Sequence, residues 1–280
     1  MNLLPMSVVA AAGLAASVVA APVPADHVAV ELVGESTALV PGRSAWLGLR
    51  FVHEPHWHTY WINPGDSGLA TKLRWNLPAG FRAGEIEWPV PQRFGVGELF
   101  NFGYDADVLL PVRLDVPADA KIGSVAHVAV EAKWLVCREE CVPGNAMLAL
   151  DLPIDPQSAA DPRWQAAFAR AHAAQPRTGA WNAAARDLGD RIEVTLASND
   201  RRAGPPADAA LDAFVVQRQV VGYSPPQIAR DADALTLTFA KSEYFTGLPP
   251  ALDLVLVDRS LPDAGAWSAR AAFTRAQSTP

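Results

Sequence analysis

Cys137 and Cys141 are the residues whose type and spacing most directly suggest chemistry. They are the only two cysteines of the 280-residue chain, and they lie in the segment Trp134-Leu-Val-Cys-Arg-Glu-Glu-Cys-Val-Pro-Gly144. In the chain-entropy view, a disulfide that closes so short a loop stabilises a fold by about 2 kcal/mol, against about 4.7 kcal/mol for a loop of roughly 100 residues. Strained or exposed disulfides are the labile and catalytic ones. We therefore interpret the pair as a redox-active dithiol/disulfide.

The residues between the two cysteines would tune how acidic the thiols are. Arg138 favours the thiolate, whereas Glu139 and Glu140 favour the neutral thiol. A weakly acidic thiol leaves less readily and attacks well once it ionises, which suits a reductant better than an oxidant. The pair follows an alternating apolar segment and precedes Pro143-Gly144, so we expect it at a strand end or turn, partly exposed. An inert local disulfide, or two free thiols, is the alternative.

A second group of chemically capable side chains lies in His53-Glu-Pro-His56-Trp-His58-Thr-Tyr-Trp61. Imidazole and thiolate ligands together suit copper(I) or zinc, so His53, His56 and His58 are a candidate metal site. No fourth ligand is evident, and the spacing matches no closed structural site. We therefore favour a packed or recognition surface. Its members would be these imidazoles and the aromatic side chains of Trp57, Tyr60 and Trp61.

The elements that must position these residues are mostly short strands. In residues 126–136, five apolar side chains share one face of a predicted strand. Further strands are predicted at residues 28–33, 44–52, 108–116 and 147–154, and in the second half at 191–197, 213–218, 235–240, 252–257 and 267–273. Residues 63–68, 88–93 and 101–104 are rich in Pro, Gly or aromatic residues and are interpreted as loops. This pattern is typical of antiparallel β-sandwiches.

Residues 161–174 break the strand pattern and predict a short helix. Asp161 can cap it, Pro162 suits its first turn, and Trp164, Phe168 and Ala171 recur at helical spacing. We expect this helix to connect two β domains.

Composition limits the class of protein. The formal net charge is -7 and the pI is about 5.3, and no basic patch is visible, which argues against a nucleic-acid partner. Residues 3–21 carry no charge and resemble the apolar region of a secretory signal, followed by small residues at a cleavage site. Export would place the cysteines in an oxidising compartment, where a disulfide persists.

Several motifs together resemble one known family. His58-Thr-Tyr-Trp-Ile-Asn-Pro-Gly-Asp-Ser-Gly68, Trp88-Pro-Val-Pro91, Tyr104 and the cysteine segment resemble the periplasmic N-terminal region of the DsbD/ScsB family of thiol:disulfide interchange proteins. The ScsB-like branch is the more similar one. The resemblance covers residues 27–155 with specific motifs and is mostly architectural beyond them.

The resemblance implies an immunoglobulin-like fold that carries one redox cysteine pair. With the strand and helix pattern, we predict an all-β fold of two immunoglobulin-like β-sandwich domains joined by a short helix-containing linker. The segments expected are a signal peptide at 1–25, a redox β-sandwich at 26–156, a helical linker at 157–177 and a second β-sandwich at 178–276. The family's active cysteines fall on Cys137 and Cys141, and a capping loop shields the pair in DsbD. We take Trp57, His58, Tyr60 and Trp61 as the candidate shield or partner-binding surface.

The resemblance also implies partners and a route for electrons. A membrane-embedded domain or protein would supply electrons, and thioredoxin-like periplasmic proteins would receive them, with no cofactor. The attacking thiol is that of Cys137, the N-terminal cysteine, or that of Cys141. In this family the second cysteine of the pair attacks at least as readily as the first. Two rival functions stay open: a copper(I)-binding tolerance protein that uses His53, His56, His58 and the cysteines, and an inert exported binding module.

Overall fold

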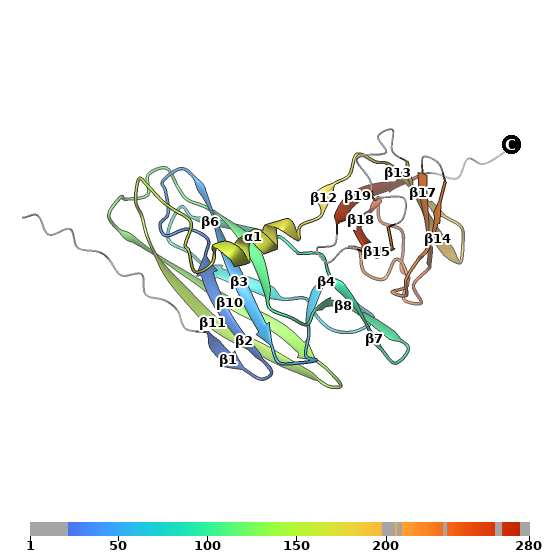
Figure 1. Ribbon diagram of the computed structural model, residues 1–280, viewed down its shortest axis with the longest axis horizontal. Helices are drawn as coiled ribbons and strands as arrows, with labels where there is room; N and C mark the ends of the chain where they lie inside the picture. Colours follow the sequence, from blue (N-terminus) through green and yellow to red (C-terminus); the bar gives the residue numbers. More distant parts are fainter. Residues whose placement is uncertain (1–21, 198–204, 206–208, 232–233, 261–264, 275–280) are drawn as a thin grey trace, which may run out of the picture.

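The fold is all-β apart from one short helix, and its sheets form sandwich-like and barrel-like arrangements, in agreement with the immunoglobulin-like all-β fold expected from the sequence. The computed structural model describes residues 22–197, 205, 209–231, 234–260 and 265–274. Figure 1 shows the first domain in blue to green, the helix in yellow and the second domain in orange to red. Of the expected signal sequence, residues 1–21 lie outside the described residues, and Val23–Ala25 form strand β1.

The first domain stacks two main sheets. One has the strand order β1 (Val23–Ala25), β2 (Val28–Gly34), β3 (Ser44–His53), β9 (Val108–Asp115) and β6 (Arg82–Ile86). The other has the order β11 (Cys141–Pro153), β10 (Val125–Cys137) and β5 (Lys72–Asn76). Apolar side chains from both sheets form one buried core.

Strand β10 confirms the alternation predicted for residues 126–136. The five side chains of one face are all buried: Val128, Val130, Ala132, Trp134 and Val136. They pack with Leu32, Leu49 and Phe51 of the facing sheet in the same core cluster. Each large aliphatic side chain buried in this way stabilises the fold by about 1.5–3 kcal/mol. The hairpin that carries the two cysteines is thus the end of a strand whose inner face is buried along its length.

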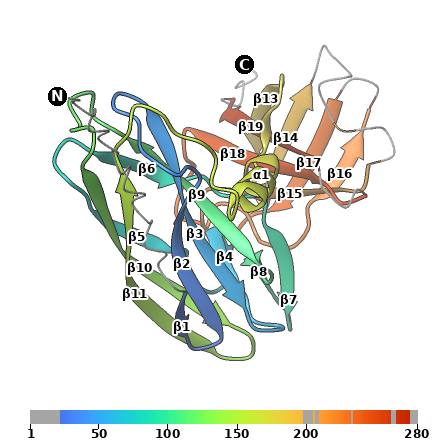
Figure 2. The same ribbon diagram turned by 60° about the vertical axis from the view of Figure 1, so that its left-hand side comes forward.

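A third, smaller sheet extends from the first domain toward the second. Its order is β4 (Thr59–Gly65), β8 (Leu99–Tyr104) and β7 (Gln92–Val96). Both views show these strands on the side of the first domain that faces the second (Figures 1 and 2). The prediction of loops is therefore wrong for residues 101–104, which lie in β8, and for the start of 63–68, which ends β4. Hairpin pairing overrides the weak strand propensity of their glycines and asparagines.

Helix α1 (Gln165–Ala173) lies within the segment predicted to be helical. It begins later than Asp161, whose carboxylate accepts a hydrogen bond from the Arg163 amide at 3.0 Å in the preceding turn. Phe168 and Ala171 are buried against Val33 and Leu109 of the first domain. The helix is therefore packed on the first domain and is not a free linker.

The second domain is one continuous hydrogen-bonded sheet with its own core. Its order is β15 (Leu211–Val215), β18 (Ala251–Asp258), β19 (Ala266–Phe273), β13 (Asn182–Asp187), β14 (Arg191–Ala197), β17 (Ala234–Ala240) and β16 (Gln227–Arg230), with β12 (Arg177–Thr178) paired to β19. Within the described ranges, no helix has the length and apolar character needed to cross a membrane.

Candidate functional site

Cys137 and Cys141 form a disulfide across the tip of the β10–β11 hairpin. Cys137 ends β10 and Cys141 begins β11, and the two are directly paired in the antiparallel register with their Cα atoms 4.2 Å apart. Arg138, Glu139 and Glu140 form the turn between them, and all three are exposed. The expectation of a pair at a strand end is confirmed. Strand β11 begins earlier than the predicted residue 147, because the hairpin ladder continues to its tip.

The two cysteines differ in exposure. Cys137 is 2% exposed, whereas Cys141 is exposed. Thiol–disulfide exchange requires access of the attacking thiolate to one sulfur along the S–S axis. Cys141 is therefore the residue of the pair that a partner can approach from solvent.

His58 lies beside Cys137 on the neighbouring strand. The His58 amide donates to the Cys137 carbonyl at 3.0 Å, and the Cys137 amide donates to the His58 carbonyl at 3.0 Å. Side chains of such a directly opposed antiparallel pair project to the same face of a sheet. Cys141, Cys137 and His58 therefore form one row across three adjacent strand segments.

The His58 imidazole is buried between two aromatic rings. It stacks on Phe94 with ring centroids 4.8 Å apart and meets Tyr60 edge-on at 5.1 Å. Burial, with a smaller contribution from His53, lowers the pKa of His58 to about 4. Among the described residues, its Nε2 atom has no hydrogen-bond partner. His58 is therefore a neutral imidazole beside the buried cysteine at physiological pH.

Tyr60 contacts the exposed cysteine. Its hydroxyl lies 3.6 Å from Cys141 Sγ, and a disulfide sulfur can only accept in such a contact. Burial raises the pKa of Tyr60 to about 12, so the hydroxyl stays protonated wherever a cysteine thiol ionises. It can therefore donate to the sulfur in both redox states.

Trp57 supports the turn of the hairpin. It is buried and stacks on His27 with ring centroids 3.6 Å apart. The Arg138 guanidinium lies 5.6 Å from the Trp57 ring centroid, in cation–π range. The positive charge of Arg138, which would favour a thiolate, therefore also interacts with the Trp57 ring.

Trp61 is the one member of the predicted shield that faces elsewhere. It is buried, and its ring meets Phe214 of the second domain edge-on at 6.1 Å. Successive side chains along a strand alternate in direction, so Trp61 points away from the face that carries His58 and Tyr60. The structure places Tyr60 at Cys141, His58 beside Cys137, Trp57 at Arg138 of the turn, and Trp61 at the domain interface.

The three histidines proposed as metal ligands do not converge. Both ring nitrogens of His53 are hydrogen-bonded, Nδ1 to the Ala106 carbonyl at 2.7 Å and Nε2 to the Thr59 hydroxyl at 3.0 Å. His56 is exposed with a φ of 72°, and His58 is buried. In the part of the chain that the structure describes, no three His, Cys, Asp or Glu side chains lie together as a metal site.

Phe94 is the residue of the site that sequence reasoning missed. It lies on β7, which begins at Gln92 and so includes the last two residues of the loop predicted at 88–93. Phe94 reaches the site through the β7–β8 hairpin. An aromatic residue next to a Pro-rich stretch was the available signal. Its contact with His58 depends on a pairing between strands distant in sequence, which local pattern does not reveal.

Comparison with known proteins agrees with this geometry. The N-terminal periplasmic domain of ScsB from Proteus mirabilis has a TM-score of 0.64 and 19% identity, covering 89% of this chain and 94% of that chain. A sporulation control protein from Bacillus subtilis has a TM-score of 0.23 and 10% identity, covering 88% of this chain and 90% of that chain; so low a score carries no argument. No curated protein sequence matches the chain.

The likeness to the ScsB domain shows the fold of both domains. The redox hairpin lies within residues 28–153, which match the family described as "Thiol:disulfide interchange protein DsbD, N-terminal". Residues 28–153 therefore form a domain of the DsbD N-terminal family.

Proposed function

We propose that the protein is a periplasmic thiol–disulfide carrier, in which the Cys137/Cys141 pair passes electrons to disulfides of partner proteins. One observation carries the proposal. The disulfide sits at a hairpin tip of a DsbD N-terminal domain with one cysteine exposed and the other buried. A bridge of this kind closes only a short loop and contributes little stability, which favours a role in exchange.

The forward reaction starts from the reduced pair. The Cys141 thiolate attacks one sulfur of the partner disulfide, forming a mixed disulfide and releasing the partner's other sulfur as a thiolate. The Cys137 thiolate then attacks Cys141 Sγ, which re-forms the internal disulfide and releases the second partner thiolate. In total, two electrons and two protons pass to the partner, and the pair is oxidised.

Recharging reverses these steps with an electron donor. A donor thiolate attacks the exposed Cys141 sulfur and the Cys137 thiolate leaves. The donor's second thiolate then attacks the donor's other sulfur, which is bonded to Cys141 in the mixed disulfide. This step forms the donor's disulfide and releases Cys141 as a thiolate. The proposed donor is a membrane-embedded domain or protein, and the proposed acceptors are thioredoxin-like periplasmic proteins, so the chain would act as a component of a protein-disulfide reductase.

The surrounding side chains have distinct proposed roles. Tyr60 would stabilise the Cys141 thiolate through the contact that its hydroxyl already makes at 3.6 Å. His58 would shield Cys137 without adding charge. Arg138, Glu139 and Glu140, all exposed in the turn, would contribute charge complementarity to the partner surface. Neither step needs a dissociable cofactor.

A capture experiment tests the proposal. Cys137→Ser, which keeps the exposed cysteine, is incubated with an oxidised thioredoxin-like domain of protein disulfide isomerase as the probe, because its potential of about -180 mV lies at the upper end of the range predicted for the carrier. Mixed disulfides are resolved by non-reducing electrophoresis and mass spectrometry. We expect a one-to-one adduct through Cys141 that dithiothreitol dissolves. Reduced wild-type protein should reduce the same probe with one disulfide lost per molecule oxidised. No adduct and no reduction, with stoichiometric copper(I) bound by the reduced protein, would favour the metal-binding rival.

A further inference from the structure

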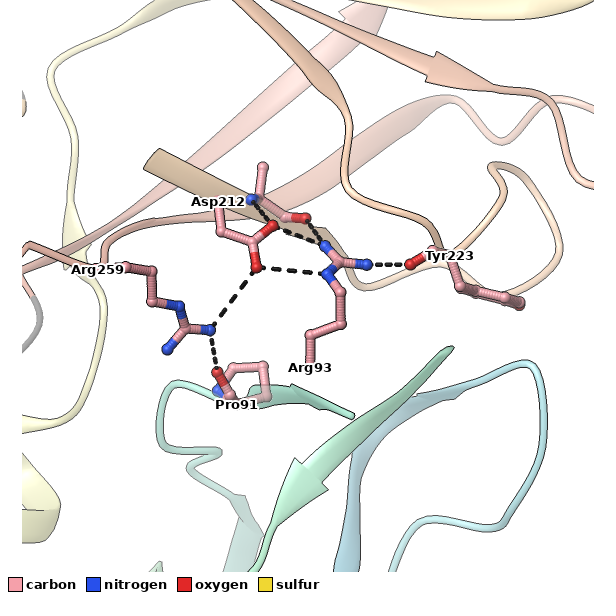
Figure 3. Close-up of polar contacts among 6 residues, drawn as sticks. Pro91, Arg93, Asp212, Tyr223 and Arg259 are labelled. Carbon is pink, nitrogen blue, oxygen red and sulfur yellow. Dashed lines mark hydrogen bonds and ion pairs between the residues drawn. The ribbon is translucent and has the colours of Figure 1, made fainter. Parts of the chain in front are cut away.

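The two domains are joined by an ion pair that is largely removed from solvent. Arg93 of β7 donates from Nη2 to Asp212 Oδ1 of β15 at 2.7 Å and to the Ala213 carbonyl at 2.9 Å. Its Nη1 donates to the Tyr223 carbonyl. The side chains of Arg93 and Asp212 are only 9% and 15% exposed. Figure 3 shows the guanidinium reaching from the first domain into this set of acceptors.

Aromatic rings enclose the same guanidinium. Its Cζ lies 4.7 Å from the ring centroid of Phe102 and 4.8 Å from that of Phe214, which belong to different domains. Arg259 adds a hydrogen bond from the second domain to the Pro91 carbonyl at 2.8 Å, two residues before Arg93 (Figure 3). A planar guanidinium that is both stacked and bidentate is held in one orientation. The strand that carries it is therefore fixed to the second domain.

A second connection joins β4 to the same strand of the second domain. Asn63 is fully buried, and its Nδ2 donates to the Val215 carbonyl at 2.7 Å. Its Oδ1 accepts from the Gly65 amide at 3.2 Å. Strand β15 thus contacts both β7 and β4 through polar groups that are largely buried.

Both connections attach next to residues of the redox site. Phe94 follows Arg93 in β7, and successive strand residues point to opposite faces, so Arg93 faces the second domain while Phe94 stacks on His58. Asn63 lies in the same strand, β4, as Tyr60. His58 in turn is hydrogen-bonded through its backbone to the buried Cys137.

We propose that the second domain clamps the shield of the redox pair, with Arg93 as the positioning residue. By holding β7 and β4, the Arg93–Asp212 and Asn63–Val215 contacts keep Phe94 on His58 and so limit access to the Cys137 sulfur. The clamp directs exchange to Cys141. The inference rests on the proposed function only in taking this pair as the one that exchanges.

Alkylation of single cysteines by iodoacetamide tests the clamp without requiring any exchange. In a Cys141→Ser background, where Cys137 is the only thiol, its alkylation rate is followed by mass spectrometry. Asp212→Asn removes the negative charge of the acceptor, and Arg93→Lys removes the planar guanidinium that binds several acceptors at once. Asn63→Asp replaces the amide donor by a carboxylate that faces the Val215 carbonyl. Since hydrogen bonds to charged groups are the strong ones, we expect alkylation of Cys137 to accelerate about tenfold in each variant.

Two controls separate the clamp from a general loosening of the fold. In a Cys137→Ser background, the exposed Cys141 should be alkylated at a rate that the three variants change less than about twofold. Arg186→Gln removes the Arg186–Glu193 ion pair of the second-domain sheet and should leave both rates unchanged.

Two results would overturn the inference: unchanged Cys137 rates in all three variants, or equal acceleration of both cysteines. Should one variant fold poorly, the remaining two decide between these outcomes. If instead the wild-type pair fails to exchange electrons while the alkylation pattern holds, the clamp stands and the proposed carrier function fails.

Discussion

Cys141 lies directly opposite Cys137 in the β10–β11 register, yet Cys141 is exposed and Cys137 is 2% exposed. The asymmetry arises because Cys137 is flanked by β11 on one side and by His58 of the adjacent segment on the other. Cys141 is on the outer strand of its sheet. The structure thus gives the two cysteine residues different exposure to a partner.

The asymmetry predicts that the two single-cysteine variants react at different rates. With 5,5′-dithiobis(2-nitrobenzoic acid), we expect Cys137→Ser, which keeps Cys141, to react at least about tenfold faster than Cys141→Ser, because the buried thiol must wait for local opening. The released aryl thiolate is followed by absorbance. Comparable rates of the two variants in the folded state would contradict the assignment of Cys141 as the attacking residue. As a control, the two variants should react at comparable rates after unfolding in urea.

Tyr60→Phe should make Cys141 a weaker acid. The hydroxyl that lies 3.6 Å from Cys141 Sγ would donate a hydrogen bond to the thiolate, and its loss should raise the pKa of that thiol by about one unit. The measurement is the pH dependence of alkylation of Cys141 in the Cys137→Ser background, with and without Tyr60→Phe. Identical titration curves would show that Tyr60 only packs against the sulfur.

The stability of the fold should fall in mild acid because of His58. Its pKa is lowered from 6.5 to about 4 by burial, so the unfolded state binds a proton in a pH range where the folded state does not. Acidification from pH 6.5 to pH 4 should therefore decrease the free energy of unfolding by about 2 kcal/mol through this residue. His53, whose pKa burial also lowers, adds in the same direction.

Urea denaturation at several pH values measures this loss. His58→Asn should flatten the dependence between pH 6.5 and pH 4, whereas His56→Gln, which changes an exposed residue, should retain it. A wild-type free energy that stays level across this range would show that the His58 imidazole accepts a proton without cost.

Gly68→Ala should displace Tyr60. Gly68 has a φ of +94°, and a Cβ added there would lie 2.2 Å from the Tyr60 ring. Gly189 is the matched control, because its φ is +95° and no described atom lies within 4 Å of its added Cβ. Backbone strain alone should destabilise Gly189→Ala by about 1–2 kcal/mol.

The ring clash should make Gly68→Ala more destabilising than Gly189→Ala by at least about 1 kcal/mol. It should also slow alkylation of Cys141, which Gly189→Ala should not. Thermal or urea denaturation and the alkylation rate check the two effects. Equal destabilisation with normal reactivity would show that the Tyr60 ring moves aside freely.

Much of this arrangement could be predicted from the sequence. Strong alternation at residues 126–136 predicted the central strand β10, and the cysteine pair with its flanking Pro143-Gly144 predicted a strand end. These features are local, so periodicity and turn chemistry suffice to recognise them. The helix was also predicted, apart from its packing on the first domain.

The surroundings of the pair could be predicted only in part. Residue type alone points to Trp57, His58 and Tyr60, and the structure places His58 and Tyr60 at the cysteines and Trp57 at Arg138 of the turn. Trp61 lies at the domain interface instead, because strand alternation turns it to the other face. Phe94 and the Arg93–Asp212 contact depend on pairings between distant segments, and no local pattern in the sequence encodes those.

The reduction potential of the Cys137–Cys141 pair tests the carrier function most directly. Purified protein is equilibrated with glutathione or dithiothreitol buffers of known ratio, and free thiols are trapped and counted by mass spectrometry. A potential between about -180 and -270 mV, the range of exchange proteins, is predicted. A potential well below about -300 mV, the range of structural bridges, or a pair that never forms a bridge, would contradict it.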